Sequence, residues 1–392
     1  SRIECITKDT MEEACITENE RRFSQSEDTP PMSPDIIAQV GLLAEKEGAD
    51  QILDGTFQIL PGCDPYLLYL SEAMRMEERV RAAGPISTRI SLEEHIQGWR
   101  KQKECTAAVS SGLSFSDHKA ATDDPDMAEI DRLLREIPYH QGFAPELYQV
   151  ITDFEILKKS GVYDVEKMRT IQLFVAQFNM NNKKTGRDVM ARAEELGVMP
   201  KEQAGSRKNH RSVLSALNKV LTMDLLRLRR QAGALCSNDA KSCFDRIVHW
   251  VASLCLRRLG LQKEPTIEMF ESIQKAWHYI ATAYGESTRR YGGNRFPPLQ
   301  GAGQGNGGGP TIWAVISAVL IAVMRRYGHG ISIISPLIFM ALYVVCFAFV
   351  DNTDVVHGAR DVTTPGEDVI PEMQEVVNRW EGSVRATGGA LV

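Results

Sequence analysis

Hydrophobic and polar positions along this chain predict helices in its first third and a mixture of helices and strands after that. Apolar residues recur at helical spacing in several segments. Helices are expected over residues 34–46, 67–83, 92–100, 127–147 (broken at Pro138 and Gly142), 186–196, 209–230, 246–260 and 311–326. Residues 155–173 are typical of a hairpin whose outgoing strand ends in an apolar run. Residues 342–354 read as a buried strand, a tight turn and a second strand.

The first 35 residues lack an apolar run and are rich in charged residues, serine and proline. They predict a disordered polar lead-in and not a signal peptide. The next segment, 36–130, is expected to form a mostly helical N-terminal extension. Apolar residues make up 43% of the chain and charged residues 24%, which is the composition of an ordinary globular protein.

Charge is distributed unevenly along the chain. The net charge is −6, yet residues 156–295 contain 25 Lys and Arg against 13 Asp and Glu. A basic central block between acidic ends favours a groove for phosphate backbones, with solvated helix faces as the alternative. The eight cysteines include no C-x-x-C pair, so a reducing compartment fits better than a disulfide framework.

Three short segments carry the candidate chemistry. Asp239 and Asp245 follow a stretch compatible with a strand, and Asp351 follows the apolar run 342–350. Between them, the glycine-rich segment 304–310 (QGNGGGP) opens a long apolar stretch. Glycines allow close backbone approach to a ligand and proline suits the first turn of a helix; a flexible linker is the alternative interpretation. If the two strands are neighbours, Asp239 and Asp351 lie within reach of each other.

In this order the three segments resemble motifs A, B and C of a template-directed polymerase palm, most closely that of reverse transcriptases. Two further segments extend the resemblance. Residues 158–173 resemble K-x-G … R-P-I-x-L of the fingers, with Thr170 in place of the proline, and residues 203–211 resemble Q-x-G-F-R-x-x-R-S. The resemblance covers about residues 90–392. It is closest to transposable-element enzymes, similar to those abundant in diatom and other protist genomes.

This resemblance implies an α+β fold with the fingers and palm of a right-hand polymerase. The fingers would span residues 131–235, and the palm, an antiparallel sheet backed by helices, residues 236–392. No thumb is expected in the chain, as in a fragment of a longer enzyme.

The resemblance also assigns roles to individual residues. Asp239 and Asp351 would bind metal and be catalytic, with Asn352 in the place of the second motif C aspartate. The residues expected to contact the nucleotide are Lys159, Arg169, Phe244 (as a steric gate against a 2′-hydroxyl), Gln304 and Gly305. Those expected to contact template and primer are Gln203, Arg207, Lys208 and Arg211.

The implied reaction is RNA-directed DNA synthesis with Mg²⁺ or Mn²⁺ as cofactor. The implied partners are an RNA or DNA template-primer and deoxynucleoside triphosphates, in the cytoplasm or the nucleus. Asn352 removes one negative charge from the metal site, so a weakened or inactive enzyme is expected, and a catalytically dead nucleic-acid-binding remnant is an alternative.

A different class of function is left open by residues 331–350, which carry no charge. Twenty such residues meet the length criterion for a membrane-spanning helix, and Arg325 and Arg326 would supply a positive flank. Pro336 and the aromatic and β-branched residues from Tyr343 onward fit buried strands better. The favoured interpretation has no membrane, and a single-pass protein with its span at 331–350 is the alternative.

Overall fold

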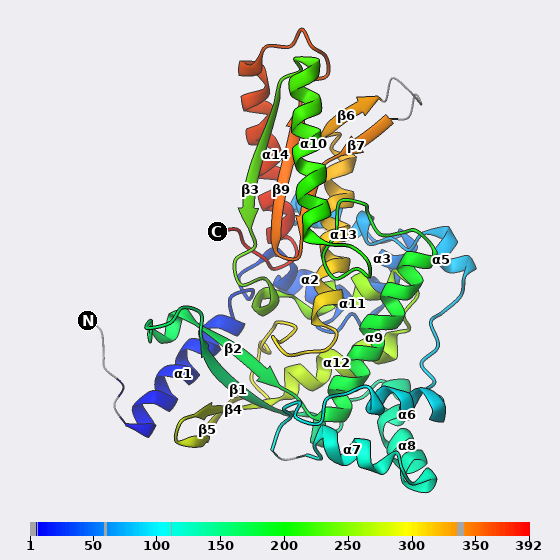
Figure 1. The fold of residues 1–392 in the computed structure, drawn as a ribbon, viewed down its shortest axis with the longest axis vertical. Coiled ribbons are helices and arrows are strands. Elements are labelled where there is room, and N and C mark those ends of the chain that lie inside the picture. The colour runs from blue at the N-terminus through cyan, green and yellow to red at the C-terminus, as the bar shows by residue number, and fades with distance from the viewer. Residues whose placement is uncertain (1–4, 6, 59–60, 111, 335–340) are drawn as a thin grey trace.

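The structure is a computed structural model that describes residues 5, 7–58, 61–110, 112–334 and 341–392 (Figure 1). Within these residues the chain has fourteen α-helices and nine strands arranged in mixed and antiparallel sheets. The α+β class expected from the sequence is therefore confirmed.

Helices dominate the first part of the chain. The first eight are α1 (Lys8–Phe23), α2 (Pro34–Val40), α3 (Glu47–Asp54), α4 (Pro65–Ala73), α5 (Glu78–Ala82), α6 (Leu92–Arg100), α7 (Phe115–Ala121) and α8 (Pro125–Gln141). The others are α9 (Ala176–Glu195), α10 (Ser212–Arg229), α11 (His249–Arg257), α12 (Lys263–Lys275), α13 (Gly309–Arg326) and α14 (Gly366–Arg385). Short 3-10 turns cover Pro30–Met32, Glu146–Tyr148, Val165–Lys167 and Cys243–Arg246.

The strands form three sheets. The first has the order β2-β1-β4-β5, from β1 (Val150–Leu157), β2 (Met168–Leu173), β4 (Trp277–Thr282) and β5 (Gly285–Gly292), with β1 and β4 parallel. The second is antiparallel, with the order β3-β9-β8, from β3 (Gly233–Asp239), β8 (Cys346–Phe349) and β9 (Asn352–Gly358). The third pairs β6 (Ile331–Ile334) with β7 (Ala341–Val344).

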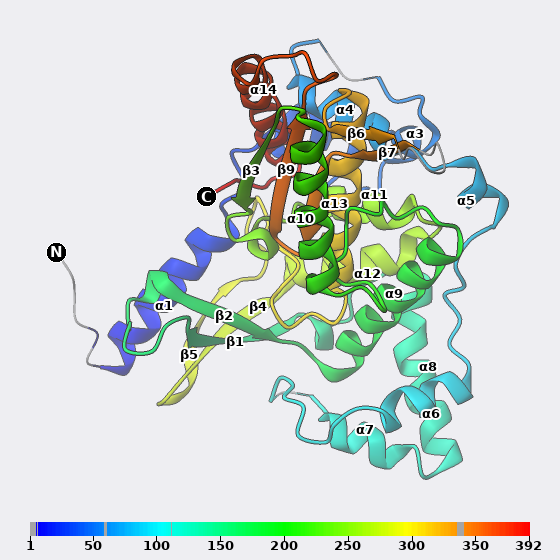
Figure 2. The same cartoon turned by 45° about the horizontal axis from the view of Figure 1, so that its top comes forward.

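Helices cover both faces of the three-stranded sheet. In both views α14 lies behind β3 and β9, and α10 lies in front of them (Figures 1 and 2). The β8–β9 turn and the end of β3 point towards the loop that precedes α13 (Figure 2). This arrangement places the turn and the strand end at the same end of the sheet, where the last residues of the chain, 390–392, pair with residues 239–241.

The largest core lies around α13, which packs on α4, α9, α11 and α14. Its sequence is apolar on all sides, as expected for a helix that is buried in a protein core. Among the described residues, α13 is the one helix long and apolar enough to cross a membrane, and 78% of that stretch is buried inside the protein. The segment 331–350 forms β6, β7 and β8 where it is described, and residues 335–340 lie outside the described residues.

Residues 7–35 of the N-terminal segment are ordered, which corrects the expectation of a disordered lead-in for that part of residues 1–35. Helix α1 begins with a capping box at Thr7 and packs Ile16 and Phe23 against Ile280 of β4. Asn19 and Arg22 of the same helix donate hydrogen bonds to Glu155 and Thr170 of the four-stranded sheet. Only four apolar residues of α1 supply its buried face, so the helix is stable through tertiary contacts and not through its own pattern.

Two other expectations concern where elements begin and end. The hairpin of 155–173 is confirmed as β1–β2, and the turn and second strand of 342–354 are confirmed in the β8–β9 pair. The single buried strand expected over 342–350 is instead divided into β7, which pairs with β6 and exposes Leu342 and Tyr343, and β8. The boundaries expected after residues 130 and 235 fall inside α8 and β3, which are continuous. Pro138 does not break α8, which ends at Gly142 in the left-handed conformation.

Candidate active site

Asp239 and Asp351 lie next to each other at one end of the three-stranded sheet. Asp239 is the last residue of β3 and lies opposite Asn352, the first residue of β9. The Ala240 amide donates a hydrogen bond of 3.2 Å to the Asp351 carbonyl oxygen. The adjacency predicted from the sequence is therefore confirmed for the backbone positions of the two aspartates.

The turn that carries Asp351 is held from two sides. Val350 has a φ of 55°, a strained conformation for a β-branched residue. The Trp313 indole of α13 donates a hydrogen bond of 2.5 Å to the Val350 carbonyl oxygen. On the other side, a Cβ added at Gly205 would lie 2.4 Å from the Val350 nitrogen, so the chain at 203–205 packs directly on the turn. These contacts explain how the strained turn persists.

The two carboxylates influence each other electrostatically. The pKa of Asp239 is raised, first by partial burial and then by the negative charge of Asp351, while the Ala240 amide opposes the shift. Within the described part of the chain neither carboxylate has a cationic partner. Two neighbouring carboxylates without a counter-charge favour a cation as ligand.

The donor set suits one kind of metal site and not another. No group of three or more His, Cys, Asp or Glu side chains that could hold a metal ion occurs among the described residues. A closed structural site of the zinc type is therefore not formed there. Mg²⁺ commonly binds through one or two carboxylates together with substrate phosphates, and Asp239 and Asp351 fit that requirement.

Asn352 and Asp354 face different surroundings. The Asn352 side-chain amide donates a hydrogen bond of 3.4 Å to Asp351 Oδ1. Asp354 accepts hydrogen bonds from Ser237 and from Lys219 Nζ of α10, the latter at 2.7 Å. Asp354 is thus committed to an ion pair and does not replace the carboxylate that Asn352 lacks.

Phe244 and Asp245 lie in the 3-10 turn that follows β3. The Phe244 carbonyl oxygen accepts a hydrogen bond of 2.9 Å from Ala302, and its ring lies against Gly309 at the start of α13. Asp245 is buried, and its Oδ1 accepts a hydrogen bond of 3.4 Å from Gln304 Nε2. Burial raises the pKa of Asp245 to about 6, against the opposing charge of Arg22.

The glycine-rich loop is clamped between β2 and α9. Gly305 has a φ of +135°, and a Cβ at this position would lie 2.1 Å from the Gln172 carbonyl oxygen. The Gln172 amide donates a hydrogen bond of 2.8 Å to the Gln304 carbonyl oxygen. On the other side Asn179 of α9 donates to the Gly305 carbonyl (3.2 Å) and accepts from the Gly307 amide (2.6 Å). These bonds are those of an ordered loop and not of a flexible linker.

The two basic residues expected at the nucleotide lie on the β1–β2 hairpin. Lys159 is exposed in the turn, and Arg169 is exposed on β2 opposite Ile156. Neither side chain forms an ion pair with a described residue, and neither contacts Asp239 or Asp351. Both cations are therefore free in the structure, but they are not assembled with the two aspartates.

The segment 203–211 only partly agrees with its expected contact to template and primer. Gln203 is fully buried and is hydrogen-bonded to Ser317 of α13 and to the Gly205 amide, so its role is corrected to a structural one. Arg207 pairs with Glu194 at 2.6 Å and also donates to two backbone carbonyls. Because its charge is neutralised inside the protein, Arg207 is corrected in the same way. Lys208 and Arg211 are exposed.

Asn179 is a functional candidate that the sequence analysis missed. It fixes the glycine-rich loop through both atoms of its side-chain amide. Asn179 lies before the stretch 186–196 that was expected to be helical, and a single asparagine carries no local signal, because its partner Gly305 lies 126 residues away in the chain.

No protein-family model matches this sequence, and no curated protein shows significant similarity to it.

Proposed function

We propose that this chain is a template-directed nucleotidyl transferase of the reverse-transcriptase type, derived from a transposable element. The observation that carries the proposal is the meeting of Asp239 and Asp351 at one end of an antiparallel sheet. The clamped glycine loop and Phe244, which lies against the helix that this loop opens, support it further. On this proposal, the three-stranded sheet with α10 and α14 is the palm, and the four-stranded sheet belongs to the fingers.

Asp239 and Asp351 are the residues that would hold Mg²⁺ or Mn²⁺. When bound, such ions lower the pKa of an attacking hydroxyl and neutralise phosphate charge. The two carboxylates supply the negative charge for this, and the strained turn at Val350 fixes the position of one of them.

The other residues would bind and orient the substrates. Phe244 would set the space next to the sugar, because its ring is fixed against Gly309. Gln304 and Gly305 would position the nucleotide and template through a loop whose backbone is held by Gln172 and Asn179. Lys159 and Arg169 would contact the triphosphate if the β1–β2 hairpin closes over the site.

The proposal is tested by primer extension on poly(rA)/oligo(dT) with Mg²⁺ or Mn²⁺. Four proteins are compared: the natural chain, Asn352→Asp, Asp239→Ala, and the double variant Asp239→Ala with Asn352→Asp. Asn352→Asp should increase synthesis, because a second carboxylate replaces an amide that donates to Asp351. Asp239→Ala should abolish it, while Asp354→Asn, which removes a carboxylate from the same strand, should not. Absence of synthesis in every version of a folded protein would contradict the proposal.

One observation favours a second candidate, a nucleic-acid-binding protein without turnover. The Asn352 amide donates its hydrogen to Asp351 and so occupies one of the lone pairs that a metal would use. Under this proposal the natural chain binds template-primer but does not extend it, and Asn352→Asp restores little. Measuring binding and extension on the same duplex separates the two candidates.

A further inference from the structure

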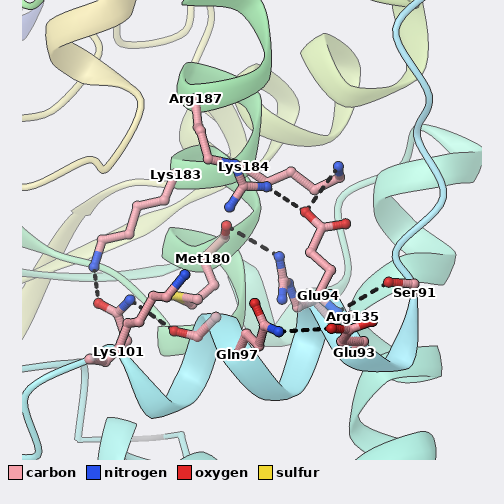
Figure 3. Close-up of a pocket in the computed structure, with 12 residues that line it drawn as sticks. Ser91, Glu93, Glu94, Gln97, Lys101, Arg135, Met180, Lys183, Lys184 and Arg187 are labelled. Atoms are coloured by element: carbon pink, nitrogen blue, oxygen red, sulfur yellow. Dashed lines mark hydrogen bonds and ion pairs between the residues drawn. The ribbon is translucent and has the colours of Figure 1, made fainter. Parts of the chain in front are cut away.

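A pocket of about 370 Å³ opens between α6, α8 and α9 (Figure 3), and neither of the two aspartates lines it. Its wall is rich in cations. The basic residues that line it are Lys101, Arg135, Lys183, Lys184 and Arg187, and the acidic residues are Glu93 and Glu94. Gly98 lets α6 approach α9 closely, since a Cβ there would lie 3.3 Å from Met180 Cε. The pocket is therefore built by helix packing and not by a loop.

Arg135 is the buried charge of this pocket. Only 2% of the residue is exposed. Its Nε donates to Asn181 Oδ1 at 2.7 Å and its Nη2 to the Met180 carbonyl oxygen at 3.4 Å, which are both neutral acceptors. Among the described residues it forms no ion pair: Glu94 and Asp131 act on it only at longer range, and Asn181, which it contacts, in turn donates to Glu268. Buried arginines are normally paired, so an unpaired one on a pocket points to an anionic ligand.

Two lysines on the pocket are also without a carboxylate partner in the described part of the chain. Lys183 Nζ donates to the neutral Gln102 Oε1 at 2.7 Å and lies 5.1 Å from the centroid of the Phe115 ring. Burial lowers the pKa of Lys183. Lys101 forms no ion pair. Three cations without a direct ion pair among the described residues thus line one pocket.

The remaining charges on the pocket do not cancel this excess. Glu94 accepts from Lys184 at 3.3 Å and also pairs with Arg187. Asp188 pairs with the same two cations. Glu93 accepts a hydrogen bond from Gln97 and is the one pocket carboxylate in the described chain without a cationic partner. A single carboxylate against three free cations leaves the pocket basic.

The pocket is joined to the glycine-rich loop through α9. A Cβ added at Gly307 would lie 2.2 Å from Lys183 Cγ, so the stem of Lys183 packs directly on the loop. Asn179, one turn earlier on α9, holds the same loop by two hydrogen bonds. At 1.5 Å per residue, the step of four residues from Asn179 to Lys183 corresponds to about 6 Å along the helix. A strand positioned by the loop would need to travel only a short distance to reach the pocket.

The geometry points to a phosphate-binding site for a single nucleic-acid strand in this pocket, with Lys101, Arg135 and Lys183 as the phosphate ligands. The inference rests on the proposed function, because the loop that Lys183 contacts is the one assigned to the template. Cations arranged in a groove bind the backbone of single strands without reading their sequence. The strand that would lie here is the unpaired 5′ extension of the template.

Binding is measured by fluorescence anisotropy without divalent metal, so the test does not depend on catalysis. The probes are a blunt RNA–DNA duplex and the same duplex with a 5′ template extension of about ten nucleotides, within the usual site size for single strands. The variants are Lys101→Gln, Lys183→Met and Arg135→Gln. Lys263→Gln on α12, where the ammonium donates to the Glu45 carbonyl oxygen, is the matched control.

The natural chain should bind the extended duplex more tightly than the blunt one. Lys101→Gln and Lys183→Met should each weaken binding of the extended duplex roughly tenfold, the usual effect of losing a charge-assisted contact. Each should also reduce the salt dependence of that binding by about 0.7 in the logarithmic slope. Blunt-duplex binding should not change, and Lys263→Gln should match the natural chain. Arg135→Gln is interpreted only if its thermal unfolding is unchanged.

Equal loss on the blunt and extended duplexes, or no loss on either, would overturn the inference. So would a titration in which inorganic phosphate or a free mononucleotide binds in a Lys183-dependent way while the extension contributes nothing. If no DNA synthesis is detected but the pocket variants bind the duplex with a 5′ template extension more weakly, the phosphate site in the pocket is supported and the proposed polymerase activity is contradicted. If DNA synthesis depends on Asp239 but the pocket variants bind the blunt and the extended duplex alike, the polymerase activity is supported and the phosphate site in the pocket is contradicted.

Discussion

Two regions of this molecule each contain neighbouring side chains of like charge that form no ion pair. The side chains are acidic in one region and basic in the other. At one end of the three-stranded sheet, Asp239 and Asp351 are neighbours without a cation. In the α6–α9 pocket, three cations are without a carboxylate. Several other buried charges are paired, as in Glu202 with Arg325 at 2.7 Å, whereas buried Asp245 and Glu268 form no ion pair with a described residue, and burial raises the pKa of each.

Each of these two regions is expected to bind a ligand of the opposite charge. A cluster of like charges costs free energy in the folded protein, and an opposite charge from a ligand offsets that cost. A divalent cation suits the first region, and a phosphate group suits the second. Both ligands occur together in a template-primer complex with a nucleotide, which links the two regions to one activity.

The largest expected effect comes from removing one of the two aspartates. Asp239→Ala should lower metal-dependent primer extension by about 10³-fold or more, because several kcal/mol of transition-state stabilisation depend on the metal. Mn²⁺ binding followed by electron paramagnetic resonance should weaken in parallel. Lys183→Met should leave Mn²⁺ binding unchanged. Weaker Mn²⁺ binding in both variants would show that the aspartate pair and the pocket are not separate sites.

Gly305→Ala should destabilise the glycine-rich loop, which packs on Lys183 of the pocket and contacts Asp245, in the turn after β3, through Gln304. The new Cβ would lie 2.1 Å from the Gln172 carbonyl oxygen at a φ of +135°. We expect a loss of unfolding free energy of about 2–4 kcal/mol, measured by denaturant titration. Gly328→Ala is the control: its φ is +73° and its Cβ would meet nothing within 4 Å, so about 1 kcal/mol is expected. Equal losses would show that the clamp on the loop contributes nothing.

Asp245 provides a pH-dependent test next to the aspartate pair. Burial raises its folded-state pKa to about 6, above the usual value for an aspartate. The protonated form therefore stabilises the fold, fully below about pH 4, and this stability is lost as the pH rises through 6. Between pH 4 and pH 8 the natural chain should lose roughly 2–3 kcal/mol more unfolding free energy than Asp245→Asn.

The control for that experiment is Asp361→Asn. Hydrogen bonds from Thr363 and Thr364 lower the pKa of Asp361, so any contribution from this group is lost as the pH falls, which is the opposite direction. Parallel pH profiles for the natural chain and Asp245→Asn would contradict a raised pKa at Asp245.

The smallest effect is expected where charges are already paired. Lys219→Met breaks the ion pair with Asp354, which is partly exposed on both sides. Such a pair contributes about 1 kcal/mol or less, so unfolding should change little. Mn²⁺ binding should not rise, because Asp354 faces α10 and remains bonded to Ser237. An increase in Mn²⁺ binding would mean that Asp354 belongs to the aspartate site after all.

Local signals in the sequence predicted the parts of the site that lie within one element or one turn. The end of β3 at Asp239 followed from a stretch compatible with a strand, and the β8–β9 turn at Asp351 followed from an apolar run ended by turn residues. The start of α13 followed from glycine and proline ahead of an apolar stretch. Helix α6 has the same bounds in the sequence analysis and in the structure, because Ser91 caps it and its apolar positions are regular.

Burial and partners of individual side chains were decided by tertiary structure alone. Gln203 and Arg207 looked like exposed template contacts, yet one is buried against α13 and the other is paired with Glu194. Helix α1 is ordered by a sheet that begins well over a hundred residues later. The cations of the α6–α9 pocket come from three helices and show no common spacing.

The sequence by itself therefore determined only part of the secondary structure, including α6, the start of α13 and the strand ends at Asp239 and Asp351, because periodicity and turn chemistry depend on neighbouring residues. Only the tertiary structure decided which charges are neutralised and which are left free, because that depends on residues distant in the chain. For Lys183, the packing of α9 on the glycine loop places an ordinary helical lysine beside a candidate template site.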